Sequence, residues 1–144
     1  MAEEITTTTP EVAAPAPAPK AKLKKAKRSV PAGQLHIKAT FNNTIITFTD
    51  KQGGAVSTSS AGRCGFRGSK KGTAYAAGIA AEKAAEVAKK DYGMNSVDVF
   101  VKGVGLGRDA AIRAVNTQSI LISSIVDVTP IPHGGVRPKG ERKP

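Results

Sequence analysis

The hydrophobic pattern of this chain changes period along its length, and this change limits the possible folds more than any other feature. In residues 96–102 (SVDVFVK), Val97, Val99 and Val101 alternate with other side chains, which is the period of a β-strand with one buried face. Residues 73–92 are instead rich in alanine and place apolar side chains at helical spacing. The chain therefore has to pack strands and helices around a common core.

The first strand is predicted over residues 34–41. Leu35, Ile37, Ala39 and Phe41 alternate there with more polar residues. Because side chains point to opposite faces of a strand in turn, we expect these four on the buried face of a sheet.

Two more strands follow through short turns. Asn42 and Asn43 interrupt the alternation, and asparagine tolerates the positive φ that tight hairpin turns often require. Residues 44–50 then form a β-branched strand, a Lys-Gln-Gly-Gly turn follows, and residues 55–61 form a third strand of small side chains. Three consecutive strands joined by short turns predict an antiparallel meander.

The alanine-rich segment 73–92 is predicted to be a helix that lies close to the sheet, because alanine adds little bulk to a buried face. Gly93 is the expected left-handed stop, and Glu86 and Lys90 are spaced for a favourable ion pair on the wet face. The predicted buried face consists of Ala76, Ala80, Ala84 and Val87.

The remaining elements continue the alternation of strands and helices. A glycine-rich turn at 103–107 (GVGLG) follows the strand at 96–102, a second helix is predicted over 108–118, and a last strand over 120–128. The order β-β-β-α-β-α-β predicts a single α/β domain at 34–129. We expect a mixed sheet of about five strands covered by two helices.

Both flanks of this domain lack the pattern of a packed element. Residues 1–33 contain a threonine run, alternating alanine and proline, and then a lysine-rich stretch, which favours a disordered basic arm. In residues 130–144, proline, glycine and basic residues recur, so we expect an extended, disordered basic tail. The arm either contacts phosphates or is a solvated tail without fixed contacts.

The charge of the chain indicates its class of partner. It carries 22 Lys and Arg against 11 Asp and Glu, for a net charge of +11. Nucleic acid is the first partner to consider, because each cation placed on a phosphate releases a condensed counterion. The plainer interpretation is a basic protein that its charge keeps soluble.

Few residues suggest catalysis, a metal or a membrane. Cys64 is the single cysteine, which excludes an internal disulfide and a multi-cysteine zinc site. His36 and His133 have no ligand cluster around them, no nucleophile motif is present, and no apolar run reaches the roughly 18 residues of a membrane span. No secretory or transit signal is recognisable. We therefore expect a cytoplasmic protein that is not an enzyme and has no metal or cofactor.

A glycine-punctuated basic loop is predicted at 62–72 (GRCGFRGSKKG). It is not a Walker A loop, because Arg67 occupies the position of a required glycine. The glycines let the backbone approach a ligand closely, and the basic side chains favour phosphate contact over an idle loop. Phe66 either stacks on a base or anchors the loop in the core. The basic residues are Arg63, Arg67, Lys70 and Lys71.

The GVGLG turn suggests a dinucleotide-binding loop, and Asp127 lies at roughly the expected distance beyond it. The match fails because Arg108 stands where the third glycine belongs. Backbone amides at a helix N-terminus still suit a phosphate, which Arg108 would reinforce. A tight packing turn and a nucleotide-binding enzyme are the alternatives, and the enzyme predicts that Gly105→Val abolishes small-ligand binding.

Four segments carry a family resemblance: FNNTIITFTD, STSSAGRCGFRGSKKGTAYAA, VFVKGVGLGRDAAIRA and SIVDVTPIPHGGVRPKG. Over about residues 34–140 they resemble, in order and spacing, the bacterial family of small-subunit ribosomal protein eleven (the uS11 type). The resemblance implies a structural protein that binds small-subunit ribosomal RNA on the platform, near the messenger exit region and beside other platform proteins. A free-standing basic chaperone for nucleic acid is a further alternative, and it predicts no preference for ribosomal RNA.

The resemblance also implies which segments meet RNA: the Asn-Asn turn, the loop after Ala61, the GVGLGRD turn and the C-terminal tail. The candidate RNA-binding residues are Asn42, Asn43, Arg63, Phe66, Arg67, Ser69, Lys70, Lys71, Lys102, Arg108, Arg113, His133, Arg137 and Lys139.

This chain departs from the family pattern in both flanks. Family members commonly have asparagine and cysteine where Gly134 and Val136 stand here, and Glu141 interrupts the basic run. A property that depends on that asparagine does not transfer to this chain. The arm at 1–33 is longer than the usual short N-terminus, and we hypothesise that it compensates electrostatically for the weaker tail.

Overall fold

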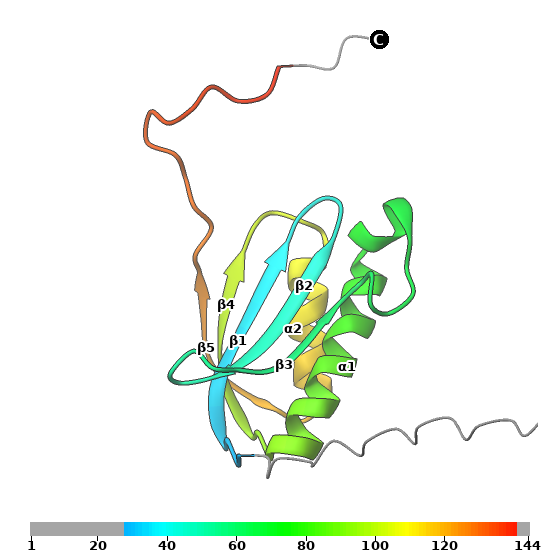
Figure 1. Cartoon of the computed structure of the whole chain (residues 1–144), viewed down its shortest axis with the longest axis vertical. Coiled ribbons are helices and arrows are strands. Elements are labelled where there is room, and N and C mark those ends of the chain that lie inside the picture. The colour runs from blue at the N-terminus through cyan, green and yellow to red at the C-terminus, as the bar shows by residue number, and fades with distance from the viewer. Residues whose placement is uncertain (1–27, 141–144) are drawn as a thin grey trace, which may run out of the picture.

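The computed structural model describes residues 28–140, which form a mixed sheet with both α-helices on one face (Figure 1). The strands are β1 (Ala32–Ala39), β2 (Thr44–Asp50), β3 (Ala55–Ser60), β4 (Ser96–Lys102) and β5 (Leu121–Asp127). The helices are α1 (Ala74–Tyr92), α2 (Gly107–Thr117) and the short 3-10 helix η1 (Gly68–Gly72). This is the α/β class and element order that the sequence predicts.

The domain meets its flanking segments close to the predicted boundaries. β1 begins at Ala32, two residues before the predicted start of the strand. Most of the predicted basic arm falls on residues 1–27, which lie outside the described residues, as do 141–144 at the end of the predicted tail. Residues 130–140 have no regular secondary structure and are exposed nearly throughout, as expected for an extended tail.

The sheet has the strand order β3-β2-β1-β4-β5. β2 is antiparallel to both β1 and β3, which confirms the predicted meander. β4 is parallel to β1 and to β5. Parallel neighbours need long crossover connections, and these connections contain α1 and α2. Four strands therefore run in the same direction and only β2 opposes them, so the segments that follow β1, β3, β4 and β5 all begin at one end of the sheet (Figure 1).

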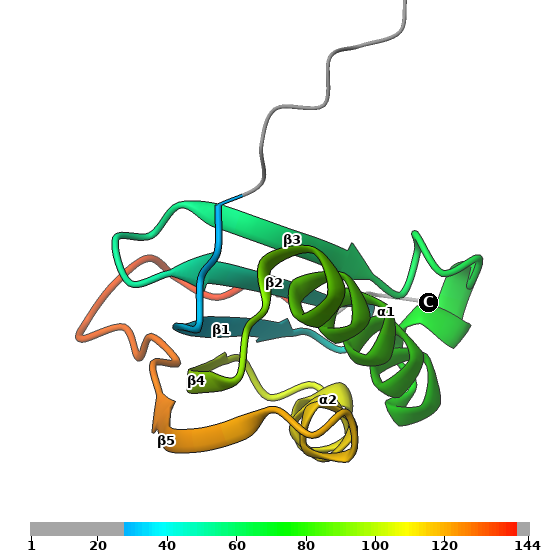
Figure 2. The same ribbon diagram turned by 90° about the horizontal axis from the view of Figure 1, so that it is seen from below.

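The core lies between the sheet and the two helices, as the end-on view shows (Figure 2). The sheet contributes the large side chains, among them Leu35, Ile46 and Phe48, and all three are fully buried. Helix α1 contributes only small ones, which lets it lie close to β2 and β3: Ala76, Ala77, Ala80, Ala81, Ala84, Ala85 and Ala88. A hydrogen bond from Ser57 Oγ to the Ala84 carbonyl, 3.0 Å long, joins β3 to this helix.

The predicted ends and ion pair of α1 are confirmed. Gly93 adopts φ 66° and its N–H donates to the carbonyls of Ala88 and Lys89, which is the left-handed stop of a helix. Lys90 forms the expected ion pair with Glu86. The hydrogen bond and the charge of Lys90 lower the pKa of the Glu86 carboxyl.

Two predictions about the core are wrong. Phe41 is 75% exposed, because β1 ends at Ala39 and Phe41 lies in the following turn. Val87 is 42% exposed, because it lies at the margin of the alanine stripe beside the edge strand β3, where no further strand covers it. Ala88 takes the buried place at this level of the helix.

Candidate nucleic-acid interface

The turn between β1 and β2 forms the centre of the candidate interface. Thr40 closes it, since its N–H donates to the Asn43 carbonyl at 2.9 Å and its Oγ1 accepts from the Asn43 N–H at 3.1 Å. The expectation of a positive φ at Asn42 and Asn43 is wrong: among the described non-glycine residues, Ser119 alone has one. The threonine bonds make a left-handed residue unnecessary here. Asn43 Oδ1 is buried and has no hydrogen-bond partner within the described residues.

The basic loop after β3 packs against one side of this turn. A Cβ added at Gly72 would lie 2.1 Å from the Phe41 carbonyl oxygen, so the missing side chain of Gly72 allows the two backbones to touch. The loop itself is held by short-range bonds, among them Cys64 N–H to the Ser60 carbonyl at 3.1 Å and Phe66 N–H to the Ala61 carbonyl at 3.2 Å. Its basic side chains are thereby placed beside the β1–β2 turn.

The GVGLG turn packs against the other side. Gly103 adopts φ +102°, and a Cβ there would lie 2.1 Å from the Ala39 carbonyl oxygen. A Cβ at Gly105 would lie 2.4 Å from the Thr40 carbonyl oxygen. The turn is therefore a tight packing turn, as one of the sequence alternatives proposed. Gly105→Val is consequently a poor test of ligand binding, because the valine would disrupt packing with or without a ligand.

Arg108 and Asp127 hold the start of α2 to the end of β5. The guanidinium of Arg108 donates to Asp127 Oδ2 at 2.8 Å and to the Gly103 carbonyl at 3.1 Å. Thr129 donates to the other carboxylate oxygen from its hydroxyl and its N–H, at 2.5 and 2.9 Å. The bond from the Thr129 hydroxyl, then the Arg108 bond, and then the bond from the Thr129 N–H lower the pKa of Asp127 from 3.8 to about 2. Asp127 thus has an internal ionic partner, and a contact of Arg108 with RNA stays a prediction.

The C-terminal tail leaves from the same end of the sheet. The Gly103 N–H donates to Thr129 Oγ1 at 3.0 Å, and the Val128 N–H donates to the Val101 carbonyl at 2.8 Å. These bonds fix the origin of the tail beside the GVGLG turn. Beyond them the predicted tail residues are exposed: His133, Arg137 and Lys139.

The basic loop carries both cations and aromatic rings at its surface. Arg67, Ser69 and Lys70 are exposed, whereas the Arg63 guanidinium turns back along β3 and donates to the Thr58 carbonyl at 3.2 Å. Phe66 is half-buried and meets Tyr75 edge to face, with ring centroids 6.0 Å apart. Because Phe66 is half-buried, stacking on a base and anchoring the loop in the core both stay open as its role.

The fold thus brings most of the predicted residues to one end. Asn42, Asn43, the residues of loop 62–72, Lys102, Arg108 and the origin of the tail all lie there, and Arg113 lies apart in the C-terminal half of α2. Sequence reasoning missed Tyr75, which is 72% exposed beside Phe66, and Lys38, which lies opposite Lys102. The strand alternation that placed Lys38 on the face away from the core was the available signal.

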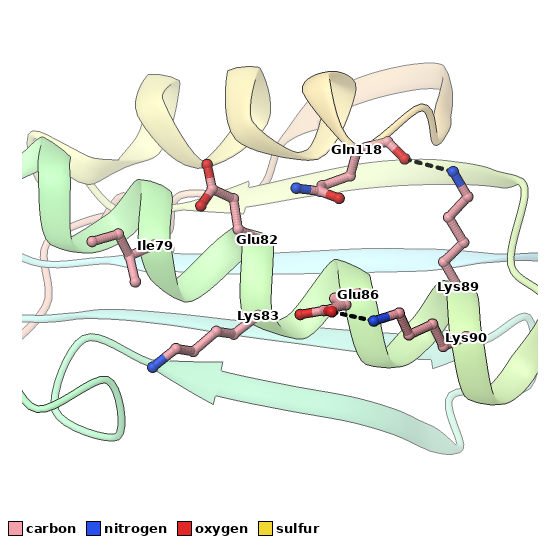
Figure 3. A pocket seen from close by; sticks show the side chains of 7 residues that line it. All are labelled: Ile79, Glu82, Lys83, Glu86, Lys89, Lys90 and Gln118. Carbon is pink, nitrogen blue, oxygen red and sulfur yellow. Dashed lines mark hydrogen bonds and ion pairs between the residues drawn. The ribbon is translucent and has the colours of Figure 1, made fainter.

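A surface groove lies elsewhere, between α1 and the C-terminal end of α2 (Figure 3). Its lining residues are Ile79, Glu82, Lys83, Glu86, Lys89, Lys90 and Gln118. Lys89 Nζ donates to the Gln118 carbonyl at 3.0 Å, and Lys90 is paired with Glu86. These lysines are engaged within the chain, so the groove resembles a solvated helix surface more than a ligand site.

Residues 28–140 contain neither a cluster of metal-ligating side chains nor a membrane-spanning helix. No group of three or more His, Cys, Asp or Glu side chains in that range is placed to hold a metal ion. No helix in it is long and apolar enough to cross a membrane.

The fold, with a basic loop, a basic tail and cations that flank two uncharged turns, defines a small α/β protein with one end suited to a polyanion. The family model described as ribosomal protein S11 matches residues 33–143. The chain is 57% identical over 121 residues to small ribosomal subunit protein uS11c of Cyanidioschyzon merolae, covering 84% of this chain and 99% of that protein. It is 54% identical over 120 residues to the uS11 proteins of Nitratidesulfovibrio vulgaris and Psychromonas ingrahamii, covering 83% of this chain and 92% of each.

This chain belongs to the ribosomal protein S11 family. The resemblance seen in the four sequence segments is thereby confirmed. Members of this family are structural components of the ribosome, and the nucleotide-binding enzyme considered from the GVGLG turn is wrong.

Proposed function

We propose that this protein binds small-subunit ribosomal RNA on the platform of the small subunit, through the end of the sheet at which β1, β3, β4 and β5 finish. The observation that carries the proposal is the convergence of the β1–β2 turn, the loop at 62–72, the GVGLG turn and the tail at that one end. The loop and the tail carry cations themselves, and Lys38, Lys102 and Arg108 flank the two turns, so all of these can face a single RNA surface.

The mechanism is phosphate neutralisation combined with shape fit. Arginine and lysine contacts to the backbone fix the position of a protein on RNA but carry little sequence information. The glycine-built turns supply a rigid shape, since each is held against its neighbour by backbone packing. A rigid basic end of this kind suits a folded RNA whose phosphates are already fixed in space, and extended basic segments order on such a surface.

The cellular role is the second part of the proposal, and membership of the family supports it. We propose that the protein supports assembly of the platform, lies near the messenger exit region, and contacts neighbouring platform proteins in a cytoplasmic ribosome. The names of its relatives, which are small ribosomal subunit proteins, support a role in that subunit.

The test is sedimentation of the tagged full-length protein with ribosomal particles at low and high monovalent salt. We expect it to stay with the small subunit in near one-to-one amount at high salt. A protein that ran free at both salts would contradict the proposal. A protein that bound total cellular RNA without preference for ribosomal RNA would instead be a free-standing chaperone.

A further inference from the structure

The sheet face opposite the helices carries a pair of stacked rings. The register places Thr58, Thr47, His36, Phe100 and Val126 in one row across all five strands. Within this row the rings of His36 and Phe100 are stacked, with centroids 5.2 Å apart and planes 14° from parallel. His36 is exposed and Phe100 is half-buried, so the pair presents flat aromatic surface to solvent.

The next row toward the basic end carries two lysines. Lys38 on β1 lies directly opposite Lys102 on β4, and like charges in that position destabilise a sheet. Neither lysine forms an ion pair with any of residues 28–140. Asp98 is the acid on this face. It lies in the row on the other side of Phe100 from the lysines, where it accepts a hydrogen bond from Ser124 at 2.8 Å. An anion bound between the two lysines would relieve their repulsion.

We propose that this open face binds an unstacked, single-stranded segment of RNA. A base stacks on the His36–Phe100 pair, and its phosphate lies between Lys38 and Lys102. The two rows are two residues apart along each strand, about 6.7 Å, which one nucleotide can span. The inference rests on the proposed function and deepens it, because it names single-stranded RNA as a second ligand class, on a surface of which the sequence had indicated Lys102 alone.

Charge complementarity favours RNA over a protein on this face. Aromatic side chains on the open face of a sheet, with cations beside them, are a common way to hold splayed bases. Lys102 is the last residue of β4, before the GVGLG turn, and Lys38 is the last residue but one of β1, close to the β1–β2 turn. The open face is therefore continuous with the basic end, and a strand of RNA leaving that end would pass Lys38 and Lys102 before it reached the rings.

The first experiment uses the full chain and a fluorescent oligouridine of about 12 nucleotides, within the span of known single-strand sites. Loss of one stacked base weakens binding by about five- to a hundredfold, so we expect that loss for Phe100→Leu and for His36→Ala. His36→Tyr should restore the affinity, since tyrosine also stacks. An RNA duplex of equal length should bind with the same affinity to all of these variants, and thermal unfolding checks that Phe100→Leu is folded.

The second experiment separates charge from stacking. Lys38→Met should reduce the slope of log affinity against log salt by about 0.7 for single-stranded RNA, whereas Phe100→Leu should leave the slope unchanged. Lys51→Met is the matched control, because Lys51 is exposed in the turn between β2 and β3 and its loss changes net charge equally. A control that lowered the slope as much as Lys38→Met would overturn the placement of the phosphate.

The outcomes distinguish this inference from the proposed function. If all open-face variants bind oligouridine like the unchanged protein, while that protein still sediments with the small subunit, the open-face inference fails and the proposed function stands. If the unchanged protein does not sediment with the small subunit, the proposed function fails. If Phe100→Leu loses a neighbouring ribosomal protein and keeps its RNA affinity, the face is a protein interface and the inference is overturned.

Discussion

The two ends of the sheet are both built from glycine-containing turns, yet they satisfy their polar groups in different ways. At the end between β2 and β3, the Asp50 carboxylate accepts hydrogen bonds from the N–H groups of Gln52 and Gly54, at 2.9 and 2.7 Å. At the opposite end, Gly72, Gly103 and Gly105 bring backbones into contact, and no cavity is left for a side chain.

The turn between β2 and β3 is therefore closed by its own acidic side chain, whereas the turns at the opposite end pack against one another and form a surface. An acidic side chain that closes its own turn leaves little attraction for a polyanion. Turns closed by backbone contact leave their cations free to point outward, as Arg67 and Lys70 do. Glycine content by itself therefore does not indicate a binding end, and the useful distinction is what each glycine touches.

The largest expected effect distinguishes the glycines of the two ends. Gly103→Ala should lower the free energy of unfolding by about 3 kcal/mol or more, because a positive φ and a backbone overlap act together. Gly53 also has a positive φ, of 87°, but nothing lies within 4 Å of an added Cβ. Gly53→Ala should therefore cost only about 1–2 kcal/mol. Urea unfolding followed by circular dichroism measures both, and equal losses would refute the packing argument.

A smaller effect is expected at the self-closed turn. Asp50→Ala should lower the free energy of unfolding by about 1–2 kcal/mol, because the N–H groups of Gln52 and Gly54 lose their acceptor. Asp50→Asn keeps an oxygen acceptor and should retain most of the stability. Neither substitution should weaken binding to small-subunit ribosomal RNA, and a filter-binding assay that found weaker binding would mean that this end also contacts RNA.

At the basic end, binding should change with little change in stability. Arg67→Ala and Arg63→Ala should each reduce the slope of log affinity against log salt by about one unit, because each removes one phosphate contact. Arg67 is the cleaner position, since the Arg63 guanidinium also bonds to the Thr58 carbonyl. Lys51→Ala at the opposite end is the matched control. A titration of RNA binding at several salt concentrations would contradict the assignment if the three variants had the same slope.

The smallest expected effect is a pH dependence at the basic end. The pKa of Asp127 falls from 3.8 to about 2 in the folded protein, so its ionised form favours folding. That contribution is fully present above about pH 4 and is lost as the pH falls toward about 2. Asp127→Asn should remove this part of the acid dependence of stability. Unfolding curves of both proteins between these pH values measure this dependence. If Asp127 were unpaired, the free energy of unfolding of the two proteins would change with pH at the same rate.

Several local features were predictable from the sequence. The alternation at 96–102, the alanine spacing of α1 and the stop at Gly93 depend on residues near one another, and each was predicted correctly. The two errors in the core, at Phe41 and Val87, concern residues at the margin of an element. Their burial depends on whether another element covers them, and periodicity carries no information on that.

The candidate site was predictable only as separate pieces. Motifs indicated the basic loop and the GVGLG turn, and the family resemblance indicated the tail. Sequence reasoning suggested a phosphate for Arg108, and it noted Asp127 at the spacing of a ribose-binding acid, whereas the folded chain pairs the two at 2.8 Å. Residues 19 positions apart meet here because β5 lies beside the strand that precedes α2.

The sequence by itself determined which segments become strands, helices and turns, since local spacing and turn chemistry set those choices. The tertiary structure alone decided that four of the five strands run the same way, and this direction gathers their following segments at one end. It also set the register that stacks His36 on Phe100 and opposes Lys38 to Lys102. No short turn joins β1 to β4 or β4 to β5, so turn chemistry could not set the direction or the register of these pairs as it does in a hairpin.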